Sequence, residues 1–188
     1  MPETTASLYH KAFVTIEGCM LFGTARQIAR GHPAVLTFVL IVFFAAQIAA
    51  RGWTLSPFLK GALTAFPIGA MCGWWWAVLV VARDGVSQPG SGRWDWVFVT
   101  PPLLALIAGL AGWPTENSPV AFAIFFAIFV ALTMSAKTLE KADAPDGDPS
   151  VGRMLATFLL MYLAPLGVWV LRSKIMRVAE RSPLTAQA

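Results

Sequence analysis

Three side chains near the N-terminus could be combined on paper into a catalytic group. Cys19 would be the nucleophile, His10 the base and Glu17 the acid, which are the roles that covalent catalysis needs. The spacing argues against this combination, because His10 and Glu17 are seven residues apart on an exposed segment and Cys19 falls in the middle of a predicted helix. We therefore predict no catalytic residues, and a non-enzymatic role is favoured.

The sequence contains no pattern typical of a metal or haem site. Its two cysteines, Cys19 and Cys72, are 53 positions apart and lack the spacing of a zinc site or a disulfide framework. Both histidines, His10 and His32, precede the first long apolar run, so the chain cannot supply a bis-histidine haem site between helices. We predict no metal and no cofactor, and we expect Cys72 to be a small buried packing residue.

An acidic segment, EKADAPDGDPS (140–150), offers Asp143, Asp146 and Asp148 as further candidates. A calcium-binding loop would need a Glu at its twelfth position, and two prolines interrupt the segment. We therefore predict that these residues form a solvated linker between two helices.

Three consecutive tryptophans, Trp74, Trp75 and Trp76, are the most distinctive feature of the chain. Successive residues of a helix point about 100° apart, so at least one of the three rings must face protein. One interpretation is an aromatic belt at the membrane interface combined with packing between helices. The other is an aromatic pocket for a lipid headgroup, a quinone or a pigment ring. The residues predicted to form such a pocket are Trp74, Trp75, Trp76, Arg83, Arg93, Trp94 and Trp96.

The elements that position these residues are predicted from composition and from the length of the apolar runs. Hydrophobic residues make up 57% of the 188-residue chain and charged residues 13%, whereas soluble domains have about 45 to 50% and about 25%. A helix needs roughly 20 apolar residues to cross a bilayer. Five runs qualify, at residues 33–50, 58–82, 96–113, 119–136 and 154–171. The predicted fold is an all-α polytopic membrane bundle of about five transmembrane helices.

Apart from Lys60 at one end of the second run, the charged residues lie outside these five runs. None of the runs places an Asp, Glu, His or Arg well inside it. Proton relays and ion pathways require ionisable groups at membrane depth, so proton-driven transport is disfavoured. The net charge of +4 is assigned to membrane-flanking basic residues, and no nucleic-acid partner is expected.

The segment before the first run is predicted to be an amphipathic helix lying along the membrane surface. Tyr9, Phe13, Ile16 and Met20 recur at helical spacing, and the apolar stretch is too short to span. The alternative is a helix packed on the cytoplasmic face of a partner protein. No cleavage site follows the first run, so we expect that run to remain in the mature protein. The chain is predicted to be one domain, with an amphipathic lead (1–32), a transmembrane bundle (33–171) and a basic tail (172–188).

Orientation is predicted from Lys and Arg near the ends of the runs, because cytoplasmic loops are enriched in them. With five crossings and the tail left out, the side holding the N-terminus has eight basic residues and the other side two. We expect a cytoplasmic N-terminus and a bacterial inner membrane. The tail conflicts with this orientation, because five crossings would place its four basic residues outside the cytoplasm. The conflict would not arise if the run broken by Pro165 entered the membrane and returned to the same side. The side of the tail stays open.

Small residues predict where helices approach closely. Gly69 and Gly73 are four apart in the second run, and Ala123, Ala127 and Ala131 form a stripe on the fourth. The helix packed there could belong to this chain or to a second subunit.

The favoured function is a non-catalytic membrane protein acting as an accessory, assembly or scaffold subunit. Its expected partners are membrane lipids and other membrane protein subunits or copies of itself. A small oligomeric channel or facilitator is the first alternative, with Thr64, Thr100, Thr133 or Gln47 facing a pore. A lipid- or quinone-binding membrane protein is the second.

Overall fold

A computed structural model gives the fold, and the regular structure that it describes is entirely helical. The described residues are 23–25, 27–29, 31–50, 54–85, 94–113, 118–144 and 149–181. Over these ranges the predicted all-α class is confirmed. Most of the predicted amphipathic lead, including Tyr9, Phe13, Ile16 and Met20, lies outside the described residues, as do the catalytic candidates His10, Glu17 and Cys19.

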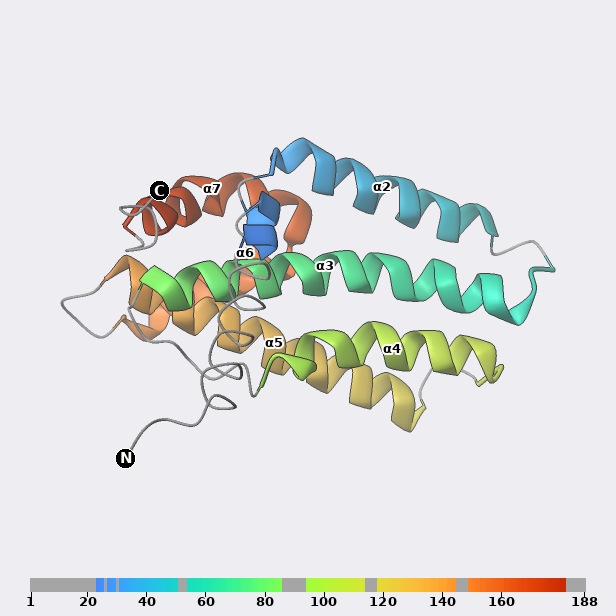
Figure 1. The fold of residues 1–188 in the computed structure, drawn as a ribbon. Coiled ribbons are helices and arrows are strands. Elements are labelled where there is room, and N and C mark those ends of the chain that lie inside the picture. Colours follow the sequence, from blue (N-terminus) through green and yellow to red (C-terminus); the bar gives the residue numbers. More distant parts are fainter. Residues whose placement is uncertain are drawn as a thin grey trace, which may run out of the picture.

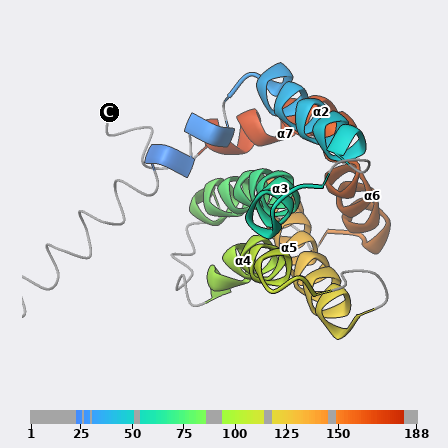
Figure 2. The same ribbon diagram turned by 90° about the vertical axis from the view of Figure 1, so that its right-hand side faces the viewer.

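The helices form a bundle around one long central helix (Figure 1). Their bounds are α2 Pro33–Ala50, α3 Pro57–Gly85, α4 Trp96–Leu110, α5 Pro119–Asp143, α6 Val151–Tyr162 and α7 Ala164–Glu180. Helix α3 contacts α2 and α7 on one side and α4 and α5 on the other, as the view along the bundle shows (Figure 2). The core therefore lies around α3, which carries the three tryptophans.

Serine caps determine where three of the helices begin. The Oγ atoms of Ser56, Ser118 and Ser150 accept hydrogen bonds from backbone N–H groups three residues later, at 3.3, 3.2 and 3.4 Å. A proline follows Ser56 and Ser118 directly, which suits the first helical position because its missing N–H would have no partner there.

Two helices, α3 and α5, are long and apolar enough to cross a membrane. A third span is possible if Gly23–Ala29 and Pro33–Ala49, which meet at 80°, are taken together. Helices α4 and α6 are apolar but shorter, at 15 and 12 residues. These apolar helices support an integral membrane protein, whereas the expected five spans are not confirmed.

The fifth apolar run, 154–171, does not form one helix. The helix is interrupted at Leu163, and Pro165 lies in the first turn of α7, which begins at Ala164. Proline lacks the N–H that would bond to the carbonyl four residues earlier, and its ring obstructs a continuing helix. Helix α6 leaves the end of the bundle where α5 ends, and α7 returns to that same end (Figure 1). The run is therefore a helical hairpin.

Helix α5 is longer than predicted, and it includes part of the segment that was expected to be a linker. It continues to Asp143, seven residues beyond the predicted end of the fourth run at Ala136. No helix-breaking residue occurs before Pro145, and Leu139 and Ala142 extend the buried face of the helix. The prediction of a solvated linker is therefore wrong for Glu140 and Asp143, and Glu140 is completely buried. Asp146 and Asp148 lie outside the described residues.

Candidate functional site

The three consecutive tryptophans point to three different neighbours. Trp74 and Trp75 are only 3% and 1% exposed, and Trp76 is half-buried. Their burial agrees with the packing between helices that the first interpretation expected for at least one of the rings. The position of the rings relative to a membrane interface stays a prediction.

Trp75 holds the α6–α7 hairpin against α3. Its indole Nε1 donates a hydrogen bond of 3.2 Å to the carbonyl oxygen of Met161. That carbonyl is four residues before Pro165, which has no N–H to offer it. Because a buried carbonyl needs a partner, the indole replaces the hydrogen bond that the helix break removes.

Trp76 joins α3 to the start of α4. Its Nε1 donates to Oδ2 of Asp95 at 3.2 Å, and Nη1 of Arg83 lies 2.7 Å from Oδ1 of the same carboxylate. Asp95 immediately precedes α4 but makes no side-chain cap. Arg83 thus forms an ion pair between α3 and the residue before α4. Its predicted place at the mouth of a ligand pocket stays a prediction.

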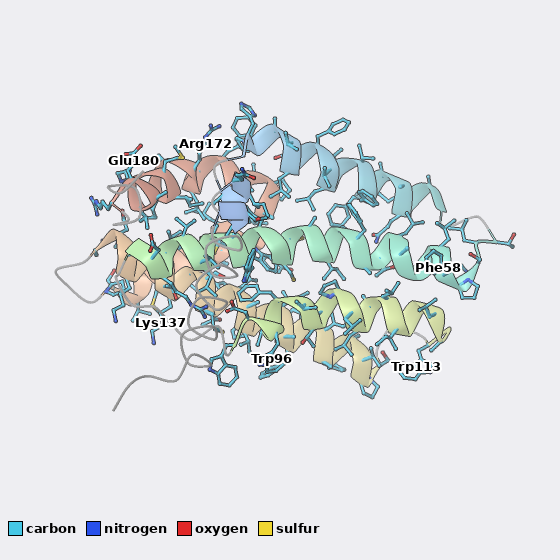
Figure 3. All side chains as sticks on the ribbon, in the orientation of Figure 1. Phe58, Trp96, Trp113, Lys137, Arg172 and Glu180 are labelled. Carbon is cyan, nitrogen blue, oxygen red and sulfur yellow. The ribbon has the colours of Figure 1, made fainter. Side chains whose placement is uncertain are left out.

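The other predicted pocket residues do not join this cluster. Trp94 and Trp96 are more than half exposed, and their rings stack at a centroid separation of 6.2 Å. Trp96 projects from the outside of the bundle (Figure 3). Arg93 lies outside the described residues. Their predicted binding role is untested and stays a prediction.

Trp74 lines a cavity of about 390 Å³ between α2, α3, α7 and the residues just before α2. The cavity is hereafter called the α2–α3–α7 groove. Its apolar walls include Leu36 and Val39 of α2, Phe66 and Gly73 of α3, and Val168 of α7. Apart from the chain neighbours and the backbone of its own helix, a Cβ built on Gly73 would have no atom within 4 Å, so the absence of a side chain there leaves open space.

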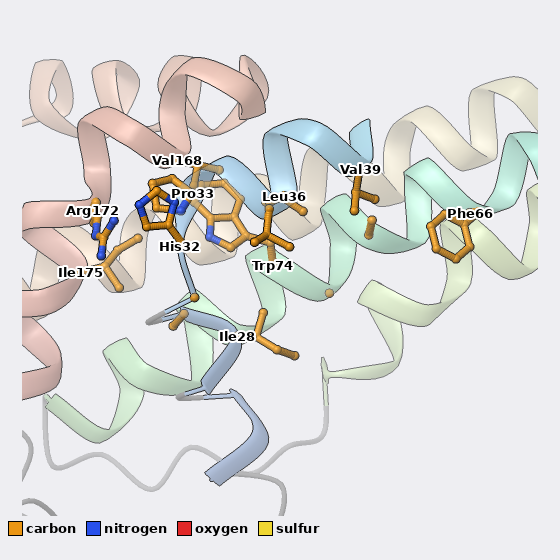
Figure 4. A pocket seen from close by; sticks show the side chains of 15 residues that line it. Ile28, His32, Pro33, Leu36, Val39, Phe66, Trp74, Val168, Arg172 and Ile175 are labelled. Atoms are coloured by element: carbon orange, nitrogen blue, oxygen red, sulfur yellow. The ribbon is translucent and has the colours of Figure 1, made fainter. Parts of the chain in front are cut away.

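The polar side chains that line this groove are His32 and Arg172, which lie together at one end of it, with Phe66 at the other (Figure 4). Nδ1 of His32 accepts the backbone N–H of Ala34 at 3.3 Å. A neutral imidazole that accepts at Nδ1 carries its hydrogen on Nε2, which is then a donor. Arg172 forms no ion pair with any residue in the described ranges. The groove thus has one end with hydrogen-bond donors and a long apolar remainder.

A buried ion cluster fastens the hairpin to α5. Lys174 of α7 donates to Oε1 of Glu140, and the hydroxyl of Thr157 on α6 donates to the same oxygen. Nε of Arg153 lies 3.2 Å from Oε2. Glu140 is fully buried, so these partners offset part of the cost of placing its polar carboxyl group inside the bundle.

Asp143 extends the cluster toward the surface. Its carboxylate lies 3.0 Å from Nη2 of Arg153, 3.6 Å from Nζ of Lys174 and 3.4 Å from Nη2 of Arg177. Sequence reasoning missed this cluster. A usable signal was present, because two acidic residues three apart on one helix match two basic residues three apart on another.

The predicted packing glycines differ in role. A Cβ on Gly69 would lie 3.5 Å from Cβ of Pro102, so Gly69 does pack against α4. Gly73 faces the groove. The closest crossing of α3 and α4 lies elsewhere, because a Cβ on Gly109 would lie 2.2 Å from Cα of Gly61. Neither Gly61 nor Gly109 was singled out from the sequence.

The alanine stripe of α5 is used only in part within the chain. Ala131 is fully buried, Ala127 is half-buried and Ala123 is exposed. Ser135, one turn further on, lies within hydrogen-bond distance of the carbonyl oxygens of Trp75 (3.1 Å) and Ala131 (3.0 Å). The stripe therefore packs inward only toward the end of α5 that lies next to the tryptophans.

The polar residues proposed for a pore bond to backbone groups of this chain. The hydroxyls of Thr64, Thr100 and Thr133 each donate to the carbonyl four residues earlier. Nε2 of Gln47 donates to the carbonyl of Leu63 at 2.7 Å and joins α2 to α3. These contacts give the channel alternative no support.

Within the described part of the chain, no three His, Cys, Asp or Glu side chains are grouped so that they could hold a metal ion. Comparison of the chain with known protein families, curated proteins and solved structures finds no match.

Proposed function

We propose that the protein is a non-catalytic integral membrane subunit that packs against lipid and against a transmembrane helix of another membrane protein. The observation that carries the proposal is the outward face of α5. In the most apolar 18-residue stretch of α5, only 22% is buried within the chain, whereas in the corresponding stretch of α3 the buried share is 50%. The exposed large side chains on this face are Phe122, Phe125, Phe126 and Phe129.

The shape of this face favours a partner helix. Ala123 is exposed among the phenylalanines, and Ala127 is half-buried. Small residues beside large ones let another helix approach closely, which increases van der Waals contact where the hydrophobic effect gives no advantage over lipid. The sequence left open whether the alanine stripe packs within the chain or against a second subunit. The exposure of Ala123 supports a second subunit for its first half.

The ion pairs between helices support a structural role for the protein. Arg83 and Asp95 join α3 to α4, and the Glu140 cluster joins α5 to both arms of the hairpin. These charged groups bind one another and fasten helices. A rigid bundle of this kind suits a subunit that positions or assembles its neighbours.

We place the end of the bundle where α3, α5 and α7 end in the cytoplasm, in a bacterial inner membrane. Figure 3 has Lys137 and Glu180 at this end and Phe58 and Trp113 at the other. If α2 to α5 cross and the hairpin returns, twelve of the fourteen basic residues lie on this side together with the N-terminus. In this arrangement the basic tail lies on the same side as the N-terminus, so the tail no longer conflicts with the orientation predicted from the other basic residues. The usage of Ala, Gly, Arg and Trp is the support for a bacterial membrane.

Site-specific photo-cross-linking in membranes tests the partner. A photoreactive residue at Phe126 of α5 is expected to cross-link a second membrane protein. The matched control is Phe38 of α2, which is equally exposed, at 67% compared with 68%, but lies on another helix. Recovery of a monodisperse monomer in gentle detergent without a co-purifying protein, together with the same cross-linking pattern at both positions, would contradict the proposal.

A further inference from the structure

We infer that the α2–α3–α7 groove is a binding site for one phospholipid with an anionic headgroup. Its volume of about 390 Å³ falls within the range of about 300 to 1,000 Å³ that is usual for ligand sites. The site requires only that the bundle lies in a membrane, and it does not depend on a partner subunit.

The chemistry of the lining changes from one end of the groove to the other. Arg172 and His32 form one end, and Trp74, Leu36, Val39 and Phe66 form the rest (Figure 4). An amphiphile with an apolar chain and a polar head has the same division. The groove follows α2 and α3, so an acyl chain lying in it would run along the direction in which these helices cross the bilayer.

The charge at the polar end selects the headgroup. Arg172 has no acidic partner among the described residues, and guanidinium groups bind phosphate oxygens through paired hydrogen bonds. Nε2 of His32 is available as a second donor, because Nδ1 accepts from Ala34. Basic pockets between transmembrane helices are known to take anionic headgroups. A zwitterionic headgroup would add an ammonium group beside Arg172, which is unfavourable.

The fold holds the polar end in place. The ring of His32 meets that of Trp169 edge to face, with centroids 5.9 Å apart, and Nε1 of Trp169 donates to Oγ1 of Thr37 at 3.2 Å. These contacts join the start of α2 to α7. The two donors therefore come from elements that are fixed relative to each other before a ligand binds, which reduces the entropic cost of binding.

Native mass spectrometry of the purified full-length chain tests the site. The chain in neutral detergent is titrated with phosphatidylglycerol and, separately, with phosphatidylethanolamine of the same acyl chains. We expect one tightly bound phosphatidylglycerol and about tenfold weaker binding of phosphatidylethanolamine, equivalent to about 1.4 kcal/mol. Equal binding of the two lipids, or recovery of a quinone in place of phospholipid, would overturn the assignment.

Two pairs of variants locate the lipid. Arg172→Gln is expected to weaken phosphatidylglycerol binding about tenfold, whereas Arg181→Gln, the same change at the exposed end of α7, should leave it unchanged. Gly73→Leu places a side chain in the open space of the groove and should abolish binding. Gly152→Leu is its control, because Gly152 also has nothing within 4 Å but lies on α6.

The Gly73→Leu variant should fold, because leucine favours a helix over glycine. Unchanged lipid binding by Arg172→Gln or by Gly73→Leu would overturn the proposal. Because no partner protein is present in this experiment, its outcome is independent of the proposed subunit role.

Discussion

The indole of Trp75 donates a hydrogen bond to the carbonyl of Met161, 86 positions away in the sequence. Both groups are buried, and the bond spans from the central helix to the hairpin that closes one end of the bundle. Pro165 removes the usual partner of that carbonyl, so one proline and one tryptophan together make the hairpin compatible with a dry interior.

Trp75→Phe is expected to destabilise the fold while keeping most of the buried ring. The carbonyl of Met161 would lose its donor, and an unsatisfied buried acceptor costs about 1 to 3 kcal/mol. For a chain of this size each kcal/mol lowers Tm by about 2 to 4 °C. Thermal unfolding in detergent measures the shift. Trp96→Phe is the control, because that ring is 58% exposed. Equal shifts in both variants would contradict the role of the hydrogen bond.

Gly167→Ala is expected to disturb the hairpin itself. A Cβ at this position would lie 1.8 Å from the carbonyl oxygen of Leu160, so the backbone of α6 or α7 must move. Overpacking of this kind costs about 1 to 3 kcal/mol. Gly152→Ala is the matched control, since nothing lies within 4 Å of the new atom, and its Tm should stay level or rise slightly. A wild-type Tm for Gly167→Ala would mean that the two arms do not pack so closely.

Glu140→Gln is expected to be the most damaging conservative change in the ion cluster. It removes the closest carboxylate partner of Lys174, which is 16% exposed, and leaves only Asp143, whose carboxylate is 3.6 Å away. Breaking a buried pair by removing one charge costs about 3 to 5 kcal/mol. The double variant Glu140→Gln with Lys174→Met should recover part of the loss, because the ammonium that lost its closest carboxylate is removed as well.

The control for this cluster is Asp143→Asn. Two of its partners, Arg153 and Arg177, are about half exposed, and Lys174, 3.6 Å away, keeps its closer pairing with Glu140, so the change should cost less. If chemical denaturation gave the same decrease in unfolding free energy for Glu140→Gln and Asp143→Asn, burial would not distinguish the two carboxylates.

The hairpin predicts which residues share a membrane side. Single cysteines at Ser150 and Arg181, in a chain without Cys19 and Cys72, should be labelled by an impermeant maleimide from the same side, and a cysteine at Ser56 from the opposite side. The reason is that α6 leaves one end of the bundle and α7 returns to it (Figure 1). Labelling of positions 150 and 181 from opposite sides would restore the fifth crossing.

Some features of the candidate site were visible in the sequence. The spacing of 100° per residue required at least one of the three tryptophans to face protein, and Trp74 and Trp75 do. Pro165 was a candidate for a break, because proline cannot supply the helical N–H. The same argument applies to Pro67 inside α3 and to Pro101 inside α4, where the helix continues. The burial of Glu140 could not be anticipated, because whether a polar residue at the end of an apolar run is solvated depends on what packs beside it.

The sequence by itself determined the helical class and the apolar segments, since these follow from local composition and periodicity. That the chain turns back before Pro165, whereas α3 continues through Pro67, was decided by the tertiary structure. Only the tertiary structure decided that Trp75 meets Met161, that Glu140 meets Lys174, and that Arg172 and His32 share one end of a groove. Each of these pairs joins residues far apart in the chain. Their contact depends on how whole helices pack, and no local pattern specifies that packing.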